Sequence, residues 1–355
     1  MESNYVVIMA GGVGTRFWPF SRQSFPKQFH DVLGTGRTLI QQTADRFEGI
    51  CPQENIYVVS GEEYKALILE QLPFLSEEQV LCEPGRRNTA PCIGYAAYKI
   101  QKKDPHANII VAPADHIILK EEEFKNKVDV AIDYASKNDA LITLGIKATN
   151  PNTGYGYIQF NEDDSAVKKV KAFTEKPNLE LAQKFIESGD YTWNAGIFVW
   201  SVASITLAFS KYLPEMADAF NAAQKDFYTD KEKASLDAAY SRCRSVSIDN
   251  AIMERADNVY MVKSDIGWSD LGTWRSVYDN SVRDENKNVI DGQVLTYDSK
   301  GCVVKTPKNK LVVLSGLEGY IVTEFDNVLM VCKLEDEQKV KQFVADAGSV
   351  GQEFV

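Results

Sequence analysis

The chain carries the stretch Met9-Ala-Gly-Gly-Val-Gly-Thr-Arg-Phe-Trp-Pro19 directly after a short apolar run, Tyr5–Met9, that is typical of a buried strand. Glycines in such a place let the backbone approach a phosphate closely and point N–H groups at it. Arg16 within the stretch and Lys27 shortly after it add positive charge. Together these features predict a cradle for a nucleoside triphosphate.

Two other glycine-rich loops fit this stretch poorly. A dinucleotide-binding loop needs a third glycine where Gly12-Val-Gly14-Thr-Arg-Phe17 has phenylalanine, and Pro19 interrupts the helix that should follow. This disfavours a nicotinamide-dependent dehydrogenase. No G-x-x-x-x-G-K-[ST] pattern occurs either, so the loop is not a Walker A motif. A turn that only reverses the chain would have no need of Arg16 and Lys27.

Short apolar runs alternate with helical patterns through the first part of the chain, which predicts an α/β fold with a Rossmann-like, mixed and mainly parallel sheet. A capping-box spacing, Thr38 with Gln41, predicts a helix after the loop. An apolar stripe predicts another from about Glu121 to Lys137. The buried strands are expected at Tyr5–Met9, Ile56–Val59, Gln79–Cys82, Asn108–Ala112, Leu141–Gly145 and Ile197–Trp200.

After Asn280 the pattern changes to short β-rich pieces separated by Gly, Asn and Asp turns. The sequence therefore predicts a large domain over residues 1–280 and a small β appendage over 285–355, which ends in a helix from about Glu335 to Ala347.

Composition excludes several classes of protein. A net charge of −11 argues against a nucleic-acid-binding surface, which needs clustered Lys and Arg. No run reaches the roughly 20 apolar residues of a membrane span, and Tyr5–Ala10 ends at glycines, so it fails as a signal peptide. The six cysteines include no C-x-x-C pair, which argues against a zinc site or a disulfide scaffold. We expect a cytoplasmic protein.

The glycine stretch, continued by Ser21-Arg22 and Pro26-Lys27-Gln28-Phe29, resembles the signature of mannose-1-phosphate guanylyltransferases, a family of sugar-1-phosphate nucleotidyltransferases. Further family motifs follow in order: Glu83-Pro84 with Arg87-Asn88-Thr89-Ala90-Pro91, Pro113-Ala-Asp-His116, Phe173-Thr-Glu-Lys-Pro177, Trp193-Asn-Ala-Gly-Ile-Phe198 and Gly267-Trp-Ser-Asp-Leu-Gly-Thr-Trp274. The resemblance implies transfer of GMP from GTP to mannose 1-phosphate, with release of pyrophosphate.

In the family, two aspartates that match Asp115 and Asp270 hold Mg²⁺. A hard cation of this kind takes oxygen ligands and usually only one or two protein carboxylates. Taken alone, Asp115 fits equally well as a turn residue after a strand, and Asp270 as the N-cap of a helix over Gly272–Asn280. His116 carries no comparable signal and is expected to be structural or to support Asp115.

The resemblance also assigns the other site residues. Arg16, Lys27 and Lys176 would join the two aspartates in catalysis, with Arg16 on the pyrophosphate, Lys27 near the reacting phosphate and Lys176 on the sugar phosphate. Nucleotide-binding residues would be Ala10, Gly11, Gly12, Gly14, Thr15, Arg16, Lys27, Glu83, Pro84, Asn88, Ala90 and Asp115. Sugar-binding residues would be Gly156, Glu175, Lys176, Asn194 and Gly196.

Some alternatives stay open at the level of sequence. The same reaction with another nucleotide and hexose 1-phosphate is possible, as is a catalytically silent regulator that binds sugar nucleotides. Asp249 and Glu254 lie in a further segment that resembles the family, and a structural role is expected for them. The appendage resembles the short left-handed β-helix that supports dimerisation in compact family members, so a homodimer is expected.

Overall fold

The computed structural model describes residues 3–355, so Met1 and Glu2 of the first predicted domain lie outside the described residues. The chain divides into two compact units. Of the described residues, unit 1 comprises 3–11, 43–114 and 118–268, and unit 2 comprises 12–42, 115–117 and 269–355. The glycine stretch from Gly12 onward and Asp115 therefore group with the C-terminal part of the chain.

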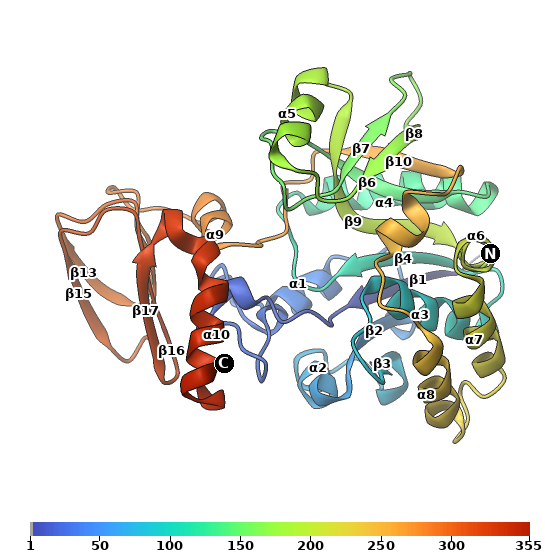
Figure 1. Cartoon of the computed structure of the whole chain (residues 1–355), viewed down its shortest axis with the longest axis horizontal. Coiled ribbons are helices and arrows are strands. Elements are labelled where there is room, and N and C mark those ends of the chain that lie inside the picture. The colour runs from blue at the N-terminus through green and yellow to red at the C-terminus, as the bar shows by residue number, and fades with distance from the viewer. Residues whose placement is uncertain (1–2) are drawn as a thin grey trace. The chain divides into compact units, whose positions relative to one another are not determined.

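Unit 1 is built on a nine-stranded sheet (Figure 1). Its strands, in spatial order, are β3 (Val80–Glu83), β2 (Ile56–Gly61), β1 (Asn4–Met9), β4 (Asn108–Pro113), β9 (Tyr191–Ser201), β6 (Leu141–Lys147), β10 (Val259–Ser264), β8 (Val167–Thr174) and β7 (Tyr157–Phe160). The parallel part runs from β3 to β4 and recurs in the β6–β10 pair. Strands β9, β8 and β7 join antiparallel. The mixed α/β class is confirmed.

Helices cover both faces of this sheet because its strands are apolar on both faces. On β4, Ile109 and Val111 belong to the core shared with α3, α6 and α7, whereas the alternate residue Ile110 points to the other face, where α4 packs. The helices of unit 1 are α2 (Lys65–Gln71), α3 (Thr89–Lys103), α4 (Glu121–Lys137), α5 (Leu179–Ser188), α6 (Val202–Tyr212), α7 (Pro214–Gln224) and α8 (Glu232–Arg242), with short turns η3 (Gln53–Asn55), η4 (Glu62–Tyr64), η5 (Glu77–Gln79) and the π-helical η6 (Asp249–Met253).

The chain leaves the sheet toward the glycine stretch and toward Asp115 at the same edge, since Met9 at the end of β1 pairs with Pro113 at the end of β4. This is the carboxyl edge at which open α/β sheets bind ligands. The short strands β5 (Ile117–Ile118) and β11 (Trp268–Ser269), and helix α1 (Leu39–Asp45), lie where the chain passes from one unit to the other.

Unit 2 contains a small β structure whose strands pair mostly in parallel. One sheet has the order β12 (Val289–Asp291), β14 (Val303–Lys305), β16 (Tyr320–Phe325), β17 (Val328–Lys333), and a second joins β13 (Gln293–Tyr297) to β15 (Leu311–Ser315). The remaining elements are η1 (Thr15–Phe17), η2 (Lys27–Phe29), α9 (Trp274–Asn280), η7 (Leu334–Lys339), α10 (Val340–Val350) and η8 (Gln352–Phe354).

The terminal helix begins later than the sequence predicts. Residues 334–339 form a 3₁₀ turn, and the α-helix starts at Val340. Leu334 at the start of the turn packs on the unit 2 core, but the turn then carries three acidic side chains. The helical stripe that packs on the same core, Val340, Phe343, Val344 and Ala347, starts at Val340. That core also receives Phe17, Trp18 and Val32 from the N-terminal stretch. None of the helices formed by residues 3–355 has the length and apolarity that crossing a membrane demands.

Candidate active site

The glycine turn wraps closely around the stem of Lys27. Gly14 has a φ of 74°, in the left-handed region, and an added Cβ would lie 2.7 Å from the Cβ of Lys27. Only glycine combines that backbone conformation with such a close approach. The Lys27 N–H also donates to the Val13 carbonyl at 3.1 Å. The turn therefore fixes where the Lys27 side chain begins.

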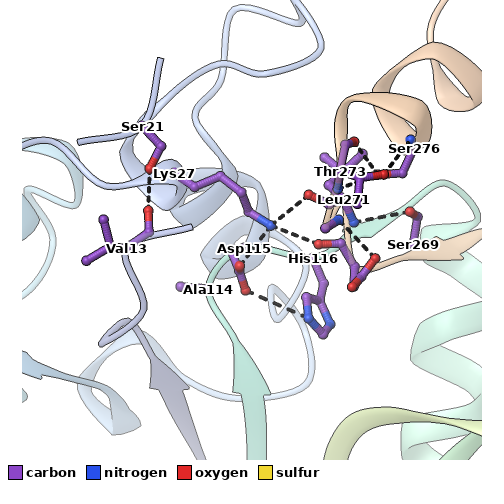
Figure 2. Close-up of polar contacts among 12 residues, drawn as sticks. Val13, Ser21, Lys27, Ala114, Asp115, His116, Ser269, Leu271, Thr273 and Ser276 are labelled. Atoms are coloured by element: carbon purple, nitrogen blue, oxygen red, sulfur yellow. Dashed lines mark hydrogen bonds and ion pairs between the residues drawn. The ribbon is translucent and has the colours of Figure 1, made fainter. Parts of the chain in front are cut away.

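The Lys27 ammonium reaches into a set of oxygen atoms (Figure 2). Its Nζ lies 2.8 Å from Oδ2 of Asp115, 2.8 Å from the main-chain oxygen of Asp270 and 3.1 Å from that of Leu271. These contacts satisfy the three donors of an ammonium group. The Lys27 side chain is 4% exposed, so this positive charge is buried and fully paired.

Asp270 lies in a constrained turn that ends before α9. Its Oδ1 accepts the Gly272 N–H at 3.0 Å, and a Cβ at Gly272 would lie 2.6 Å from Oδ2. Leu271 is buried with a φ of 42°, a conformation that costs energy for a residue with a side chain. The N-cap of α9 is Thr273, so the alternative role of Asp270 as that helix cap is wrong.

Asp115 follows β4 and is about one-third exposed. Burial alone would raise the pKa of its carboxyl, but the attraction of Lys27 and His116 outweighs this, so the pKa lies below its usual value. The contact with His116 is long, at 3.8 Å between Nε2 and Oδ1. Asp115 is therefore held as a carboxylate beside a cation.

The oxygen atoms around the Lys27 ammonium are of the kind that a divalent cation takes. The Lys27 ammonium already occupies a position between the Asp115 carboxylate and the Asp270 carbonyl, and hard oxygen donors of this kind suit Mg²⁺. Residues 3–355 contain no group of three or more His, Cys, Asp and Glu side chains that could hold a metal ion. Two aspartates match the small number of protein ligands that Mg²⁺ usually takes.

The charged group of Arg16, unlike that of Lys27, is not paired with other described residues. Its guanidinium is partly buried on η1, and within residues 3–355 it makes neither an ion pair nor a hydrogen bond. An always-charged side chain without a partner on a glycine turn is suited to an anionic ligand. The neighbouring Gly12 and Thr15 are exposed.

In unit 1, the end of β3 carries a carboxylate with an altered pKa. Glu83 accepts a hydrogen bond from the Tyr240 hydroxyl at 2.9 Å. Burial, partly offset by that hydrogen bond, raises the pKa of Glu83 to about 7. Gly11 lies beside it, since an added Cβ would be 3.7 Å from Oε2 of Glu83. No sequence pattern pointed to Tyr240, which reaches this strand from α8.

Asn88 starts α3 in an unusual conformation. It is the N-cap, its side chain accepts the Thr89 N–H, and its φ of 67° with ψ of −171° belongs to a region that is essentially reserved for glycine. The segment around it is fixed by hydrogen bonds from Ala90 to Val246 and from Val246 to Arg87. Ala10 and Ala90 are buried, and Pro84 is exposed.

The predicted sugar-binding residues meet in unit 1. Asn194 on β9 donates its N–H to the Gly156 carbonyl at 2.8 Å, and its Oδ1 accepts the Gly196 N–H at 3.1 Å. A Cβ at Gly156 would lie 2.6 Å from Oε2 of Glu175. Glu175 also pairs with the exposed ammonium of Lys176. These five residues therefore form one cluster from three strand segments.

Asp249 and Glu254 belong to this cluster. The Asn194 amide donates to Oδ1 of Asp249 at 3.0 Å, and the Glu175 N–H donates to Oε1 of Glu254 at 3.0 Å. Burial and the nearby Glu175 raise the pKa of Asp249 to about 7. In keeping with the structural role predicted for them, Asp249 orients the Asn194 side chain and Glu254 fixes the backbone at Glu175. They stand on or beside a π-helical turn, a feature that often marks functional sites.

Two family models match the chain. Residues 5–287 match the nucleotidyl transferase family, and residues 292–346 match the MannoseP isomerase/GMP-like beta-helix domain.

Individual proteins also resemble the chain. A mannose-1-phosphate guanylyltransferase of Escherichia coli is 34% identical over 348 residues, which span 95% of this chain and 74% of the relative. One of Salmonella montevideo is 36% identical over 95% of this chain and 72% of the relative. The crystal structure of a protein described as mannose-1-phosphate geranyltransferase, from Thermus thermophilus, superimposes with a TM-score of 0.86 at 28% identity, over 98% of this chain and 99% of that one.

Proposed function

Since the chain belongs to the nucleotidyl transferase family, we propose that it transfers GMP from GTP to α-D-mannose 1-phosphate, giving GDP-mannose and pyrophosphate. The observation that carries this proposal is the convergence of Lys27, Asp115 and Asp270 within one unit, beside the unpaired Arg16. Cationic side chains on and after a glycine turn, together with carboxylates from two other segments, are what a metal-bound polyphosphate requires.

The proposed chemistry needs no general base. A phosphate oxygen of mannose 1-phosphate is already anionic, so it attacks the α-phosphorus of GTP in line, and the bond to pyrophosphate breaks without a covalent enzyme intermediate. Asp115 and Asp270 would hold Mg²⁺, which when bound supplies charge neutralisation on the phosphates. Arg16 binds the leaving pyrophosphate and Lys27 the reacting phosphate, so catalysis consists of positioning and charge stabilisation.

We assign guanine recognition to Glu83 and the segment from Pro84 to Ala90, with main-chain groups of Ala10 and Gly11 in the same unit. The Watson–Crick edge of guanine presents two adjacent N–H donors, and a carboxylate accepts both. The fixed position of Glu83 beside Gly11, held by Tyr240, supports this assignment. A pyrimidine presents a different pattern of donors and acceptors on its edge, so this carboxylate favours GTP over UTP and dTTP.

We assign the hexose to the cluster of Gly156, Glu175, Asn194 and Gly196, with Lys176 on the sugar phosphate. Carboxylate and amide groups suit sugar hydroxyls, and the two glycines permit a close approach of the ring. The hydrogen bonds that orient Asn194 support this role.

We also propose a catalytic domain over residues 1–280 and a β appendage over 285–355 that joins two copies of the chain. The family matches over 5–287 and 292–346 support the division. On the β13–β15 pair, Leu295 lies opposite Val313 on a face whose alternate residues Leu311 and Tyr297 are also exposed. Such an apolar face suits a second copy.

We also propose a cytoplasmic location. The six free cysteines support a reducing environment of this kind.

Pyrophosphate release across a matrix of GTP, ATP, UTP and dTTP against mannose, glucose and galactose 1-phosphates, with Mg²⁺, tests the proposal. We expect the highest kcat/KM for GTP with mannose 1-phosphate. A higher value for another pair would replace the assigned substrates while keeping the reaction. Binding of GDP-mannose without release of pyrophosphate from any pair would identify a silent regulator instead.

A further inference from the structure

Arg22 is a charged residue buried within unit 2. It is 5% exposed, and its guanidinium donates to three main-chain carbonyls: Nη2 to Phe325 at 2.9 Å, Nη1 to Glu353 at 3.1 Å and Nε to Pro19 at 3.3 Å. The contact with the exposed carboxylate of Asp326 is longer, at 3.5 Å. The positive charge of Arg22 is therefore stabilised mainly by hydrogen bonds to main-chain carbonyls of three separate segments.

Trp18 makes a second link to the same C-terminal region. Its indole N–H donates to the Phe354 carbonyl at 2.6 Å, and the side chain is almost fully buried. Helix α10, just before that region, packs against η1, which carries Arg16. Two side chains from residues 18–22 thus attach the N-terminal stretch to residues 325–326 and 353–354.

Residues 18–27 are also hydrogen-bonded to the glycine turn. The Ser21 hydroxyl and the Lys27 N–H both donate to the carbonyl of Val13. The N–H of Phe17 donates to the Gly14 carbonyl at 2.9 Å. Arg22 is therefore hydrogen-bonded to the C-terminal carbonyls, and its chain neighbour Ser21 is hydrogen-bonded to Val13, the residue before Gly14.

We propose that Arg22 is a positioning residue for nucleotidyl transfer: it locks the turn that carries Arg16 and Lys27 onto the C-terminal β region, so that this region is part of the phosphate-binding apparatus. The inference rests on the proposed function. This role needs the planar fork of arginine, because Nε, Nη1 and Nη2 each donate to a different carbonyl. The donors of lysine share one compact nitrogen, which cannot reproduce that spacing.

The test compares Arg22→Lys with Asp326→Asn, which alters only the exposed partner. In Arg22→Lys we expect a kcat about 10- to 100-fold lower and a higher KM for GTP, because small displacements of catalytic groups cost this much. The KM for mannose 1-phosphate should stay within twofold. Asp326→Asn should behave as wild type. A folded Arg22→Lys enzyme with unchanged kcat and KM for GTP would overturn the proposal, as would an equal rise in both KM values.

Trp18→Phe keeps the test decisive if Arg22→Lys does not fold, since it removes one hydrogen bond and keeps an aromatic ring. It should change kcat and the KM for GTP in the same direction, and normal values would contradict the proposal. Hydrogen exchange supplies a readout that is independent of turnover: the peptide over residues 12–20 should exchange faster in both variants, while β7 and β8 should not. Failure of the wild type to release pyrophosphate would contradict the proposed function, whereas unchanged exchange would contradict only this inference.

Discussion

The ammonium nitrogen of Lys27 lies 2.8 Å from Oδ2 of Asp115, and Asp115 follows the strand that ends at the carboxyl edge of the sheet. The pair lowers the pKa of Asp115 and keeps a buried cation at the place where a phosphate-bound metal ion would lie. Under the proposed function, binding of the metal and substrate would replace the Lys27 ammonium by another positive charge beside Asp115.

Asp115→Asn should reduce kcat by at least about 100-fold, the scale for losing a group that stabilises transition-state charge. The fold should persist, because asparagine keeps the shape and still accepts a hydrogen bond from Lys27. Pyrophosphate release and the thermal midpoint measure the two effects. The control is Asp265→Asn, which removes an exposed carboxylate paired with Lys120 and should leave kcat unchanged. Near-normal turnover in Asp115→Asn would refute the role of Asp115.

Lys27→Met should separate catalysis from metal binding. Turnover should fall by at least about 100-fold, because a group on the reacting phosphate is lost. Binding of Mn²⁺, followed by electron paramagnetic resonance without substrates, should not weaken, because a cation that competes for Asp115 is gone. The buried Lys168 gives a matched control, since Lys168→Met should lower stability and keep kcat. Loss of Mn²⁺ binding in Lys27→Met would contradict the replacement of the ammonium by a metal ion.

GTP binding should depend on pH through Glu83. In the free protein its pKa is raised to about 7, so below that pH the carboxyl is protonated and must lose its proton before it accepts two N–H donors of guanine. Affinity should therefore rise with pH up to about 7 and then level off, with a slope of about tenfold per unit below 7.

Calorimetry with GTP on wild type, Glu83→Gln and Glu78→Gln measures this dependence. Glu83→Gln should bind more weakly and lose the slope, because glutamine does not titrate. Glu78→Gln, at a nearby exposed position, should retain it. A slope that survives in Glu83→Gln would assign the proton to another group.

Asp249→Ala should impair binding of the sugar and not of the nucleotide. It leaves the partly buried Asn194 amide without the partner at 3.0 Å that orients it, and loss of a hydrogen bond of this kind costs about 1 kcal/mol. We expect the KM for mannose 1-phosphate to rise about tenfold and the KM for GTP to stay within twofold. Asp257→Ala, which removes an almost fully exposed carboxylate, is the control. Equal changes in both KM values would show that Asp249 only supports the fold.

The sequence predicts the elements that local pattern determines. The strand over Asn108–Ala112 and the helix over Glu121–Lys137 occur as expected, because their apolar periods are clear and tertiary packing reinforces them. The glycine spacing with Arg16 and Lys27 also predicts a phosphate-binding site, which stays a prediction. The predicted start of the terminal helix was less accurate, because it depends on where the unit 2 core begins.

Contacts between distant segments could not be predicted in this way. Tyr240 on α8 donates to Glu83, and Asp249 on a π-helical turn accepts from Asn194. The residues of each pair are far apart in the sequence, and no periodic pattern of residues indicates that they pair. Arg22 appeared in the sequence only as part of the family signature, and the structure shows its guanidinium donating to the carbonyls of Phe325 and Glu353. Such roles arise from the packing of the whole unit.

The most direct test of nucleotidyl transfer follows the phosphates of GTP. The wild-type protein is incubated with Mg²⁺, mannose 1-phosphate and GTP labelled with radioactive phosphorus at either the α- or the γ-position, and the products are separated. We predict that the α-label appears in GDP-mannose and the γ-label in pyrophosphate. Recovery of the γ-label as free phosphate, or of the α-label in unchanged GTP, would contradict the account.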